Sequence, residues 1–176
     1  LASMGTYVFD AALLYDELVR DADDASSSHD FGKDIIPRLL RQGARVCARD
    51  FADSCVNMND GVPYWRDVGT IDAYWEANIA LTHVVPQLNL YDADWPIWTY
   101  QEQLPPAKFV FDDDDRRGTA IDSIVGSGCI ISGSTVRRSL LFSNVHVHDY
   151  CMLEDSVLLP SVDVGRHTVL RKAVVD

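Results

Sequence analysis

The stretch that decides the fold is residues 123–172, which read SIVGSGCIISGSTVRR (123–138), SLLFSNVHVHDYCMLED (139–155) and SVLLPSVDVGRHTVLRK (156–172). These segments hold 16, 17 and 17 residues, and each opens with a serine followed by two aliphatic residues. Ala173-Val174-Val175 starts a fourth segment of the same kind. An internal repeat of this length is typical of a solenoid, in which each unit packs on the next.

The register of the repeat predicts which side chains face inward. Aliphatic residues recur at three equivalent positions and small residues at a fourth. The columns are Ile124, Leu140, Val157, Val174; Val125, Leu141, Leu158, Val175; Ile131, Val147, Val164; and Thr135, Cys151, Thr168. Units of this length hold three near-hexapeptide strands, so we expect a triangular parallel β-helix whose coils stack at the ~4.8 Å strand spacing. A β-sandwich is disfavoured because its turn signals would recur every ~8–12 residues.

The residues before the repeat show a mixed α/β pattern. Asp10 and Thr70 are expected to be helix N-caps, and Leu13, Leu14 and Leu18 form an apolar stripe at helical spacing. The expected elements are helices at 11–22, 31–40 and 71–83 and strands at 7–9 and 45–51. Such alternation predicts part of a sheet with helices packed on it.

Residues 85–115 differ in texture from both flanking regions. Prolines 86, 96, 105 and 106 and the scarcity of periodic apolar residues predict an extended crossing segment between two domains. The charge run of residues 112–117, DDDDRR, is expected to be a solvated loop, against the alternative of a metal or effector site.

Composition limits the function. The chain has 176 residues, 47% of them apolar, and a formal net charge of −12, which makes a nucleic-acid surface unlikely. No run of ~18 apolar residues and no basic leader are present, so neither a membrane span nor a secretion signal is expected and the cytoplasm is the default location. The irregular spacing of Cys47, Cys55, Cys129 and Cys151 favours buried free thiols over a zinc or disulfide framework.

Residues 63–78, PYWRDVGTIDAYWEAN, place one carboxylate between aromatic rings just before a helix start. Pro63 favours an extended approach and Gly69 relieves the backbone at the turn, so a strand–turn–helix corner is expected, with Asp67 at the turn. On physical grounds alone the aromatic residues fit the core as well as a binding site, and Asp67 fits a turn former as well as a ligand.

This string resembles the bacterial ADP-glucose pyrophosphorylases (glucose-1-phosphate adenylyltransferases), as do LASMGTYVF (1–9), SHDFGKDIIP (28–37), WPIWTYQEQLPPAKFV (95–110) and residues 139–176. The resemblance implies an α/β plus β fold. It consists of the C-terminal part of a nucleotidyltransferase (Rossmann-like) mixed sheet domain followed by a left-handed parallel β-helix of hexapeptide-like repeats. The implied domains are 1–92 for the catalytic part, 93–120 for an extended linker and 121–176 for a β-helix that is incomplete at its C-terminal end.

The resemblance also implies the site. Ser3, Tyr7, Asp30, Phe31 and Trp65 match the pocket for glucose 1-phosphate and ADP-glucose, and Asp67 matches a catalytic residue that is a ligand of Mg²⁺. The chemistry suits these roles, because hydroxyl and carboxyl groups hydrogen-bond a sugar or phosphate, aromatic faces pack on a pyranose, and a carboxylate binds Mg²⁺.

The implied reaction converts ATP and α-D-glucose 1-phosphate into ADP-glucose and pyrophosphate for glycogen synthesis, in an allosteric homotetramer with anionic effectors. The sequence holds no G-x-x-x-x-G-K-[ST] or other Gly-rich phosphate loop, and it opens on Leu1, so we expect a fragment that is inactive alone. Three alternatives remain open: another sugar-nucleotide pyrophosphorylase, a non-catalytic oligomerisation and regulation module, and a hexapeptide acyltransferase. In the last, His146 or His148 would be the base, against the simpler interpretation that both are exposed positions on a strand.

Overall fold

The computed structural model describes residues 3–54, 63–94 and 96–176. The chain divides into two compact units, Leu1–Asp50 and Phe51–Asp176, which are treated separately below. The expected domain limits at residues 92 and 120 stay predictions, although strands of the solenoid already start at Lys108.

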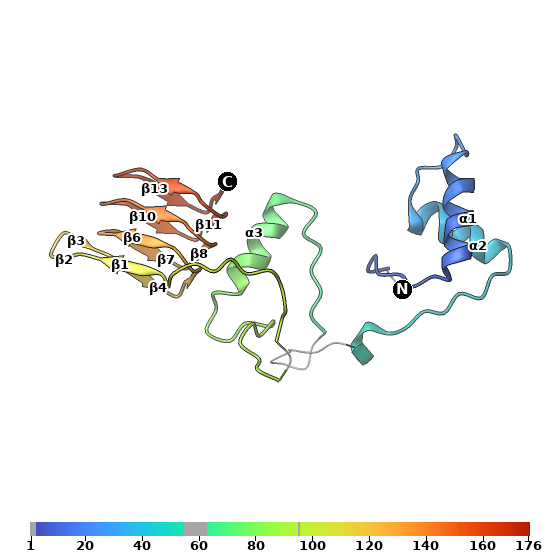
Figure 1. Cartoon of the computed structure of the whole chain (residues 1–176), viewed down its shortest axis with the longest axis horizontal. Helices are drawn as coiled ribbons and strands as arrows, with labels where there is room; N and C mark the ends of the chain where they lie inside the picture. Colours follow the sequence, from blue (N-terminus) through green and yellow to red (C-terminus); the bar gives the residue numbers. More distant parts are fainter. Residues whose placement is uncertain (1–2, 55–62, 95) are drawn as a thin grey trace. The chain divides into compact units, whose positions relative to one another are not determined.

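The first unit is a small helical assembly (Figure 1). Helix α1 spans Ala11–Ala22, the π-helical turn η1 spans Phe31–Ile35, and helix α2 spans Ile36–Arg41. The Asp10 carboxylate accepts a hydrogen bond from the Leu13 amide at 3.1 Å, which confirms this residue as the N-cap of α1.

Three expectations for the first unit are wrong. Residues 31–40 do not form one regular helix, because Pro37 has no N–H to donate to the turn before it, and the chain instead forms η1 and then α2. The buried residues of α1 are Glu17 and Asp21, whereas Leu13 and Leu18 of the expected stripe are exposed.

The strands expected at 7–9 and 45–51 are also missing. An isolated strand leaves its backbone groups unpaired, and no strand occurs among the described residues before Lys108 to pair with either segment. Residues 51–54 form the short 3-10 helix η2, Phe51–Ser54, instead of continuing a strand.

The second unit is a triangular parallel β-helix with one helix packed against it, as the repeat predicts. Its walls are three four-stranded parallel sheets. The first contains β1 (Lys108–Val110), β6 (Ile130–Ser132), β9 (His146–Val147) and β12 (Asp163–Val164). The second contains β4 (Thr119–Ile121), β7 (Thr135–Arg137), β10 (Met152–Glu154) and β13 (Val169–Arg171), and the third β5 (Ile124–Val125), β8 (Leu140–Leu141), β11 (Val157–Leu158) and β14 (Val174–Val175).

The predicted register is confirmed for the three aliphatic columns. Ile124, Leu140, Val157 and Val174 pair in sequence, and so do the columns through Leu141 and Val147. The small-residue column is wrong by one position, because Thr135 pairs with Met152 rather than Cys151. Ser134 takes the place expected for Thr135, and its hydroxyl accepts the Cys151 amide at 2.7 Å. The extra residue of the second coil lies between Val147, which pairs with Ile131, and Met152, which pairs with Thr135.

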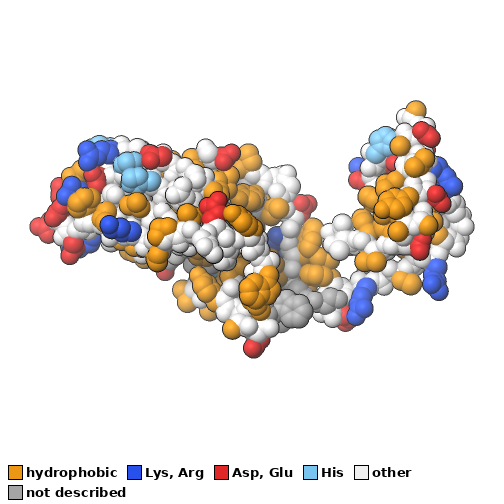
Figure 2. Space-filling view, viewed as in Figure 1, with side chains coloured by type: hydrophobic (Ala, Val, Ile, Leu, Met, Phe, Trp, Pro, Cys, Tyr) orange, Lys and Arg blue, Asp and Glu red, His pale blue; other side chains and the backbone are white. Residues whose placement is uncertain are grey.

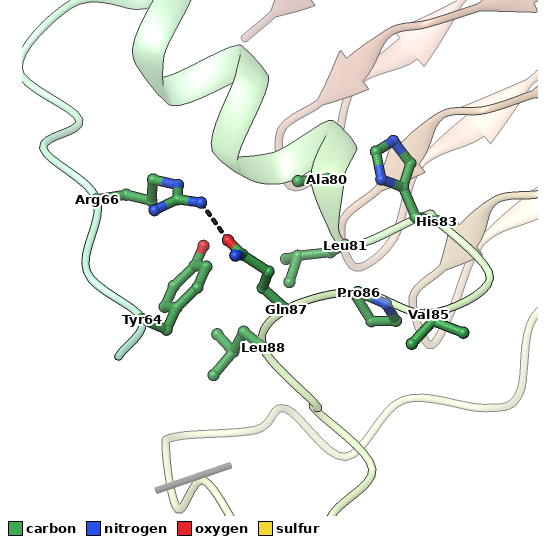
Figure 3. A pocket seen from close by; sticks show the side chains of 9 residues that line it. All are labelled: Tyr64, Arg66, Ala80, Leu81, His83, Val85, Pro86, Gln87 and Leu88. Atoms are coloured by element: carbon green, nitrogen blue, oxygen red, sulfur yellow. Dashed lines mark hydrogen bonds between the residues drawn. The ribbon is translucent and has the colours of Figure 1, made fainter. Parts of the chain in front are cut away.

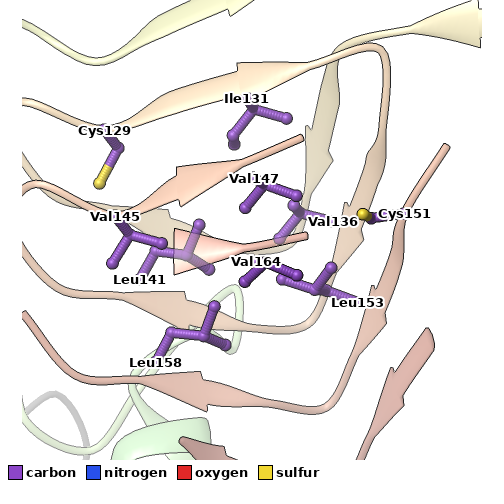
Figure 4. Packing of buried hydrophobic residues seen from close by; sticks show 10 residues of the cluster. All are labelled: Cys129, Ile131, Val136, Leu141, Val145, Val147, Cys151, Leu153, Leu158 and Val164. Atoms are coloured by element: carbon purple, nitrogen blue, oxygen red, sulfur yellow. The ribbon is translucent and has the colours of Figure 1, made fainter. Parts of the chain in front are cut away.

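Two devices hold the coils together. Inward aliphatic side chains fill the interior, with Leu153 and Leu158 fully buried (Figure 4). At one corner the serines that open the repeats form a ladder, in which the Ser139 hydroxyl accepts the Ser156 amide at 3.0 Å and donates to the Arg137 carbonyl at 2.7 Å. The ladder satisfies backbone groups that the turn would otherwise leave unpaired.

Helix α3, Ile71–Ala80, packs on this solenoid. The Thr70 hydroxyl accepts the Ala73 amide at 3.2 Å, which confirms the predicted N-cap. Ile79 is buried against Leu140 and Val157, and the Trp75 indole donates to the Asp155 carbonyl at 2.7 Å. The helix therefore covers the outer face of the third sheet.

The charge run 112–117 is an antiparallel hairpin of β2 (Asp112–Asp113) and β3 (Arg116–Arg117) rather than an irregular loop, because Asp112 and Asp113 pair with the two arginines. Cys129 and Cys151 are buried free thiols as expected, whereas Cys47 is exposed. Cys55 lies outside the described residues. In the described part of the chain no helix is long and apolar enough to span a membrane.

Candidate functional site

The first unit brings four of the predicted site residues together around Gly32. The Tyr7 ring stacks on Phe31 with centroids 5.6 Å apart, and Phe9 packs beside both rings. The Ser3 hydroxyl lies 2.6 Å from the Tyr7 hydroxyl. A methyl group added at Gly32 would lie 3.3 Å from an Asp30 carboxylate oxygen and 4.0 Å from the Tyr7 hydroxyl. The Tyr7 hydroxyl and the Asp30 carboxylate therefore lie next to a residue that has no side chain, with the Ser3 hydroxyl beside Tyr7 and the Phe31 ring stacked on the Tyr7 ring.

Asp30 has a structural role in this arrangement. Its carboxylate caps η1 by accepting the Lys33 amide at 2.8 Å, and its own amide donates to the Asp34 carboxylate at 3.1 Å. The Ser28 amide and hydroxyl donate to the same Asp34 oxygen. These bonds lower the pKa of Asp34, with the Ser28 hydroxyl as the largest cause. The loop before η1 is thus fixed by hydrogen bonds, which orients Asp30 and the adjacent Phe31 ring.

A buried ion-pair network contacts the loop before η1 through His29, and the sequence analysis did not predict this network. Arg38 of α2 donates to Glu17 at 3.1 Å and to Asp21 at 2.8 Å, and both carboxylates are 3% exposed. The His29 ring lies 2.9 Å from Asp21, and its hydrogen bond is the largest cause that lowers the pKa of this carboxyl. In the sequence Glu17 and Asp21 are four residues apart, which places them on one face of a helix but does not identify Arg38 as their partner.

Trp65 and Asp67 lie in the second unit, in the extended segment that leads into α3. The Asp67 carboxylate accepts the Gly69 amide at 3.0 Å, and Gly69 is followed at once by the N-cap Thr70. Trp65 is 44% exposed and does not contribute to the buried core. The expected turn–helix corner is confirmed, although residues 63–68 form no strand.

Next to this segment lies a pocket of about 250 Å³ (Figure 3). It lies between the extended segment and the loop after α3, and Tyr64, Arg66, His83 and Gln87 supply its polar groups. The Arg66 guanidinium lies 5.0 Å from the Tyr64 ring centroid and donates to the Gln87 side chain. Tyr64 and Arg66 alternate with Trp65 and Asp67 along the extended chain, so only the first pair lines the pocket.

The chemistry of the donor set bears on Mg²⁺. Asp67 is an exposed hard oxygen donor, and it belongs to no group of three neighbouring His, Cys, Asp or Glu ligands in the described part of the chain. Mg²⁺ is commonly held by one or two carboxylates together with substrate phosphates, so a single carboxylate fits part of such a site.

Comparison with known families also divides the chain into two parts, although the first matched part runs past Asp50 and includes α3 of the second unit. Residues 1–84 match the family described as Nucleotidyl transferase, and residues 105–176 match the family described as GlmU-like, C-terminal hexapeptide. The chain therefore joins a segment that is similar to nucleotidyltransferases to a parallel β-helix whose sequence is similar to the GlmU-like hexapeptide family.

Over all 176 residues the chain is similar to the glucose-1-phosphate adenylyltransferases. It is 69% identical to the protein of that name from Nitrosospira multiformis, 67% identical to the one from Nitrosomonas europaea and 57% identical to the one from Bradyrhizobium diazoefficiens. The resemblance expected from the sequence is thus confirmed. The chain spans about two-fifths of the length of these relatives, 41%, 41% and 42%.

Proposed function

We propose that the chain works as part of a glucose-1-phosphate adenylyltransferase, which converts ATP and α-D-glucose 1-phosphate into ADP-glucose and pyrophosphate. The observation that carries this proposal is the 57–69% identity to enzymes of that name along every residue of the chain. Its β-helix and the preceding helices fit the two matched families.

The cluster around Gly32 supports a role in binding the sugar phosphate. Aromatic faces of Tyr7 and Phe31 can pack on the apolar face of a pyranose, and the Ser3 hydroxyl and Asp30 carboxylate can hydrogen-bond its hydroxyl groups. For Trp65 we propose a role in sugar binding from the family resemblance alone, and the residue is 44% exposed.

Asp67 is the residue that we propose to hold Mg²⁺. When bound, the ion would neutralise the negative charge of the reacting phosphates. The contribution of the chain itself is the placement of the carboxylate, which the Gly69 amide and the cap of α3 hold at a fixed turn. The phosphate-binding loop is not encoded in these residues, so we expect the 176-residue chain by itself to make no ADP-glucose.

The test uses the longer enzyme that contains this chain. Asp67→Asn keeps the shape of the side chain but removes its charge, and we expect kcat to fall on the order of 10²-fold or more. Asp72→Asn is the matched control, because Asp72 is an exposed acid in the first turn of α3, the helix that Asp67 precedes. An unchanged kcat for Asp67→Asn at saturating Mg²⁺ would return Asp67 to the status of a turn residue.

A second measurement tests the reaction itself. We expect the longer enzyme to release pyrophosphate from ATP only when glucose 1-phosphate and Mg²⁺ are present, and the 176-residue chain to release none. Pyrophosphate release that does not depend on glucose 1-phosphate would contradict the proposal. Greater activity with another nucleoside triphosphate than with ATP would favour a different sugar-nucleotide pyrophosphorylase.

We also propose the assembly, location and regulation that the family resemblance implies: a cytoplasmic homotetramer in glycogen synthesis, controlled by anionic effectors. Basic side chains of the β-helix are the candidates for binding an anionic effector, and several of them already have acidic partners. Arg138 is paired with Glu154 and Asp155, Arg166 with Asp149, and Arg171 lies near Glu154. These three arginines of the repeat region are therefore paired with acids within the chain.

A further inference from the structure

His146, His148 and Asp163 form a cluster of metal-binding side chains on the outer face of the first sheet. His146 in β9 and His148, which directly follows this strand, flank the buried Val147, so both rings project outward. Asp163 is the direct neighbour of His146 on the next coil, in β12. Figure 2 shows histidine side chains beside acidic ones on the surface of the β-helix. The repeat thus places three donors, from two coils, at one spot.

The distances between the donor atoms fit a single ion. The His148 Nε2 atom lies 3.1 Å and 3.2 Å from the two Asp163 oxygens, and His146 Nδ1 lies 3.7 Å from Oδ2. One atom from each of the three side chains lies within 4.8 Å of the others. Ligands bound to one ion at ~2.0–2.1 Å are separated by about 3 to 3.4 Å, so small side-chain rotations close the site.

The electrostatics favour a cation over an ion pair alone. The two imidazole rings lie with their centroids 4.0 Å apart, so charging both would place two positive rings in contact and leave one carboxylate to balance them. Neutral imidazoles instead present lone pairs to the same point that the carboxylate faces. A divalent ion satisfies all three donors at once.

The neighbouring residues leave room for the ion and its water ligands. Gly165 follows Val164 in β12, in the position next to His148, and a methyl group added at Gly165 would touch nothing within 4 Å. The side chain of Asp163 is 65% exposed, and each histidine side chain is 37% exposed. The open positions of a three-ligand site would therefore face solvent.

We propose that His146, His148 and Asp163 bind one divalent transition-metal ion such as Zn²⁺, Co²⁺ or Ni²⁺. Imidazole nitrogen suits these ions, whereas Mg²⁺ prefers oxygen ligands, so this site is distinct in chemistry from the Mg²⁺ proposed at Asp67. The proposal rests on the contacts of the β-helix and is independent of the proposed function.

The test is a calorimetric titration of the untagged chain with ZnCl₂, in a Cys47→Ser, Cys55→Ser background that removes thiol ligands outside the cluster. We expect about one Zn²⁺ per chain, and at least about tenfold weaker binding for each of His146→Gln, His148→Ala and Asp163→Asn. His167→Ala is the matched control, because His167 is an exposed histidine of the same solenoid and stacks on Tyr150. The His167→Ala variant should bind Zn²⁺ as tightly as the background protein.

Titration with Co²⁺ gives an independent measurement. The visible absorption of bound Co²⁺ should reach its maximum at one equivalent of Co²⁺ and should be lost in Asp163→Asn. An excess of Mg²⁺ should not displace the bound Co²⁺. Thermal unfolding of each metal-free variant checks that the β-helix is intact. No saturable binding in the background protein, or equal binding in Asp163→Asn and the background, would overturn the proposal. A loss of binding in His167→Ala as large as that in His148→Ala would also do so.

Discussion

The interiors of the two units of this chain are built from different kinds of side chains. In the β-helix, aliphatic columns such as Ile131, Val147 and Val164 fill the interior, and each coil repeats the contacts of the one before. In the first unit the buried side chains of α1 are Glu17 and Asp21, which meet Arg38. The interior of the β-helix is therefore apolar, whereas the interior of the first unit combines the buried Ile35 and Leu39 with a desolvated charge network that is costly to break.

This difference predicts opposite sensitivities. A charge placed inside the β-helix should be very costly, whereas in the first unit the costly change should be the removal of a charge. The first unit also leaves large apolar side chains exposed, including Tyr15, Val19 and Leu40. Its stability rests on few contacts, so losing one partner should affect the whole unit.

The largest effect is expected from Leu158→Asp. Leu158 is fully buried in the core of the solenoid, and aspartate there loses the apolar contacts and places an unpaired carboxylate in the interior. We expect a loss of about 4 kcal/mol or more, enough to unfold the β-helix. Circular dichroism with thermal melting measures this, and Val169→Asp is the control, because Val169 lies on β13 and is 60% exposed. Equal melting temperatures for the two variants would show that the interior is not tightly packed.

Arg38→Met tests the charge network in the same way. Methionine keeps much of the side-chain volume but removes the cation that the buried Glu17 and Asp21 share, so that Arg20 alone still pairs with Glu17 and His29 alone with Asp21 among the described ion pairs. We expect amide hydrogen exchange of α1 and η1 to become fast while exchange in the β-helix stays unchanged. Arg41→Met is the control, since Arg41 lies on the same helix and is exposed. Slow exchange in α1 of the Arg38 variant would mean that apolar packing alone holds the first unit.

Acid should unfold the first unit before the β-helix without any mutation. The folded pKa of Asp21 lies below 3.8, chiefly because of the hydrogen bond with His29, and the pKa values of Asp24 and Asp34 are lowered as well. A lowered folded pKa contributes stability that is complete above about pH 3.8 and is lost as the pH falls below it. We therefore expect the protection of the amides of residues 11–41, measured against their intrinsic exchange rates at each pH, to be lost below pH 3.8, before that of the β-helix. Simultaneous opening of both units would contradict this order.

How much of this could be read from the sequence follows the same division. The repeat predicted the β-helix and the pairing of residues such as Leu140 and Val157, because each coil repeats the pattern of its neighbour. The one-residue error at Thr135 arose where the second coil is one residue longer. In the first unit, apolar spacing suggested that Leu13 and Leu18 face inward, whereas the buried pairs with Arg38 involve contacts distant in sequence that no periodicity reports.

The candidate site divides likewise. The resemblance named Tyr7 and Phe31, which the structure stacks together, but their contact spans a loop and a π-helical turn that the sequence pattern did not predict. Asp67 was placed correctly at a turn before a helix because Gly69 and Thr70 are local signals. Local caps and turns can be predicted from sequence, whereas tertiary charge pairs require the structure.

Ser156→Ala tests the serine ladder and should have a smaller effect. The Ser156 hydroxyl donates to the Glu154 carbonyl at 2.8 Å and accepts the Ala173 amide at 3.4 Å. Alanine removes the acceptor of the partly buried Ala173 amide, whereas the Glu154 carbonyl keeps its bond from the Lys172 amide. We expect a loss of about 1–3 kcal/mol in the free energy of unfolding. Ser127→Ala, at an exposed serine of the same solenoid, should change it by less than about 0.5 kcal/mol. Equal losses in both variants would show that the ladder contributes nothing specific.

The smallest effect concerns the contact between α3 and the solenoid, where polar and apolar stabilisation meet. Trp75 donates its indole N–H to the Asp155 carbonyl, and the Lys172 ammonium lies 4.9 Å from its ring centroid. Trp75→Phe keeps an aromatic ring on the buried face but removes the hydrogen bond, at a cost of about 1 kcal/mol. Exchange of the α3 amides should then become about fivefold faster, because that free energy corresponds to a fivefold change in the opening equilibrium. Lys172→Met separates the two contributions: it removes the cation but leaves the indole bond, so it should change exchange by less than Trp75→Phe does. If Lys172→Met has the larger effect, the cation rather than the hydrogen bond holds α3 on the β-helix.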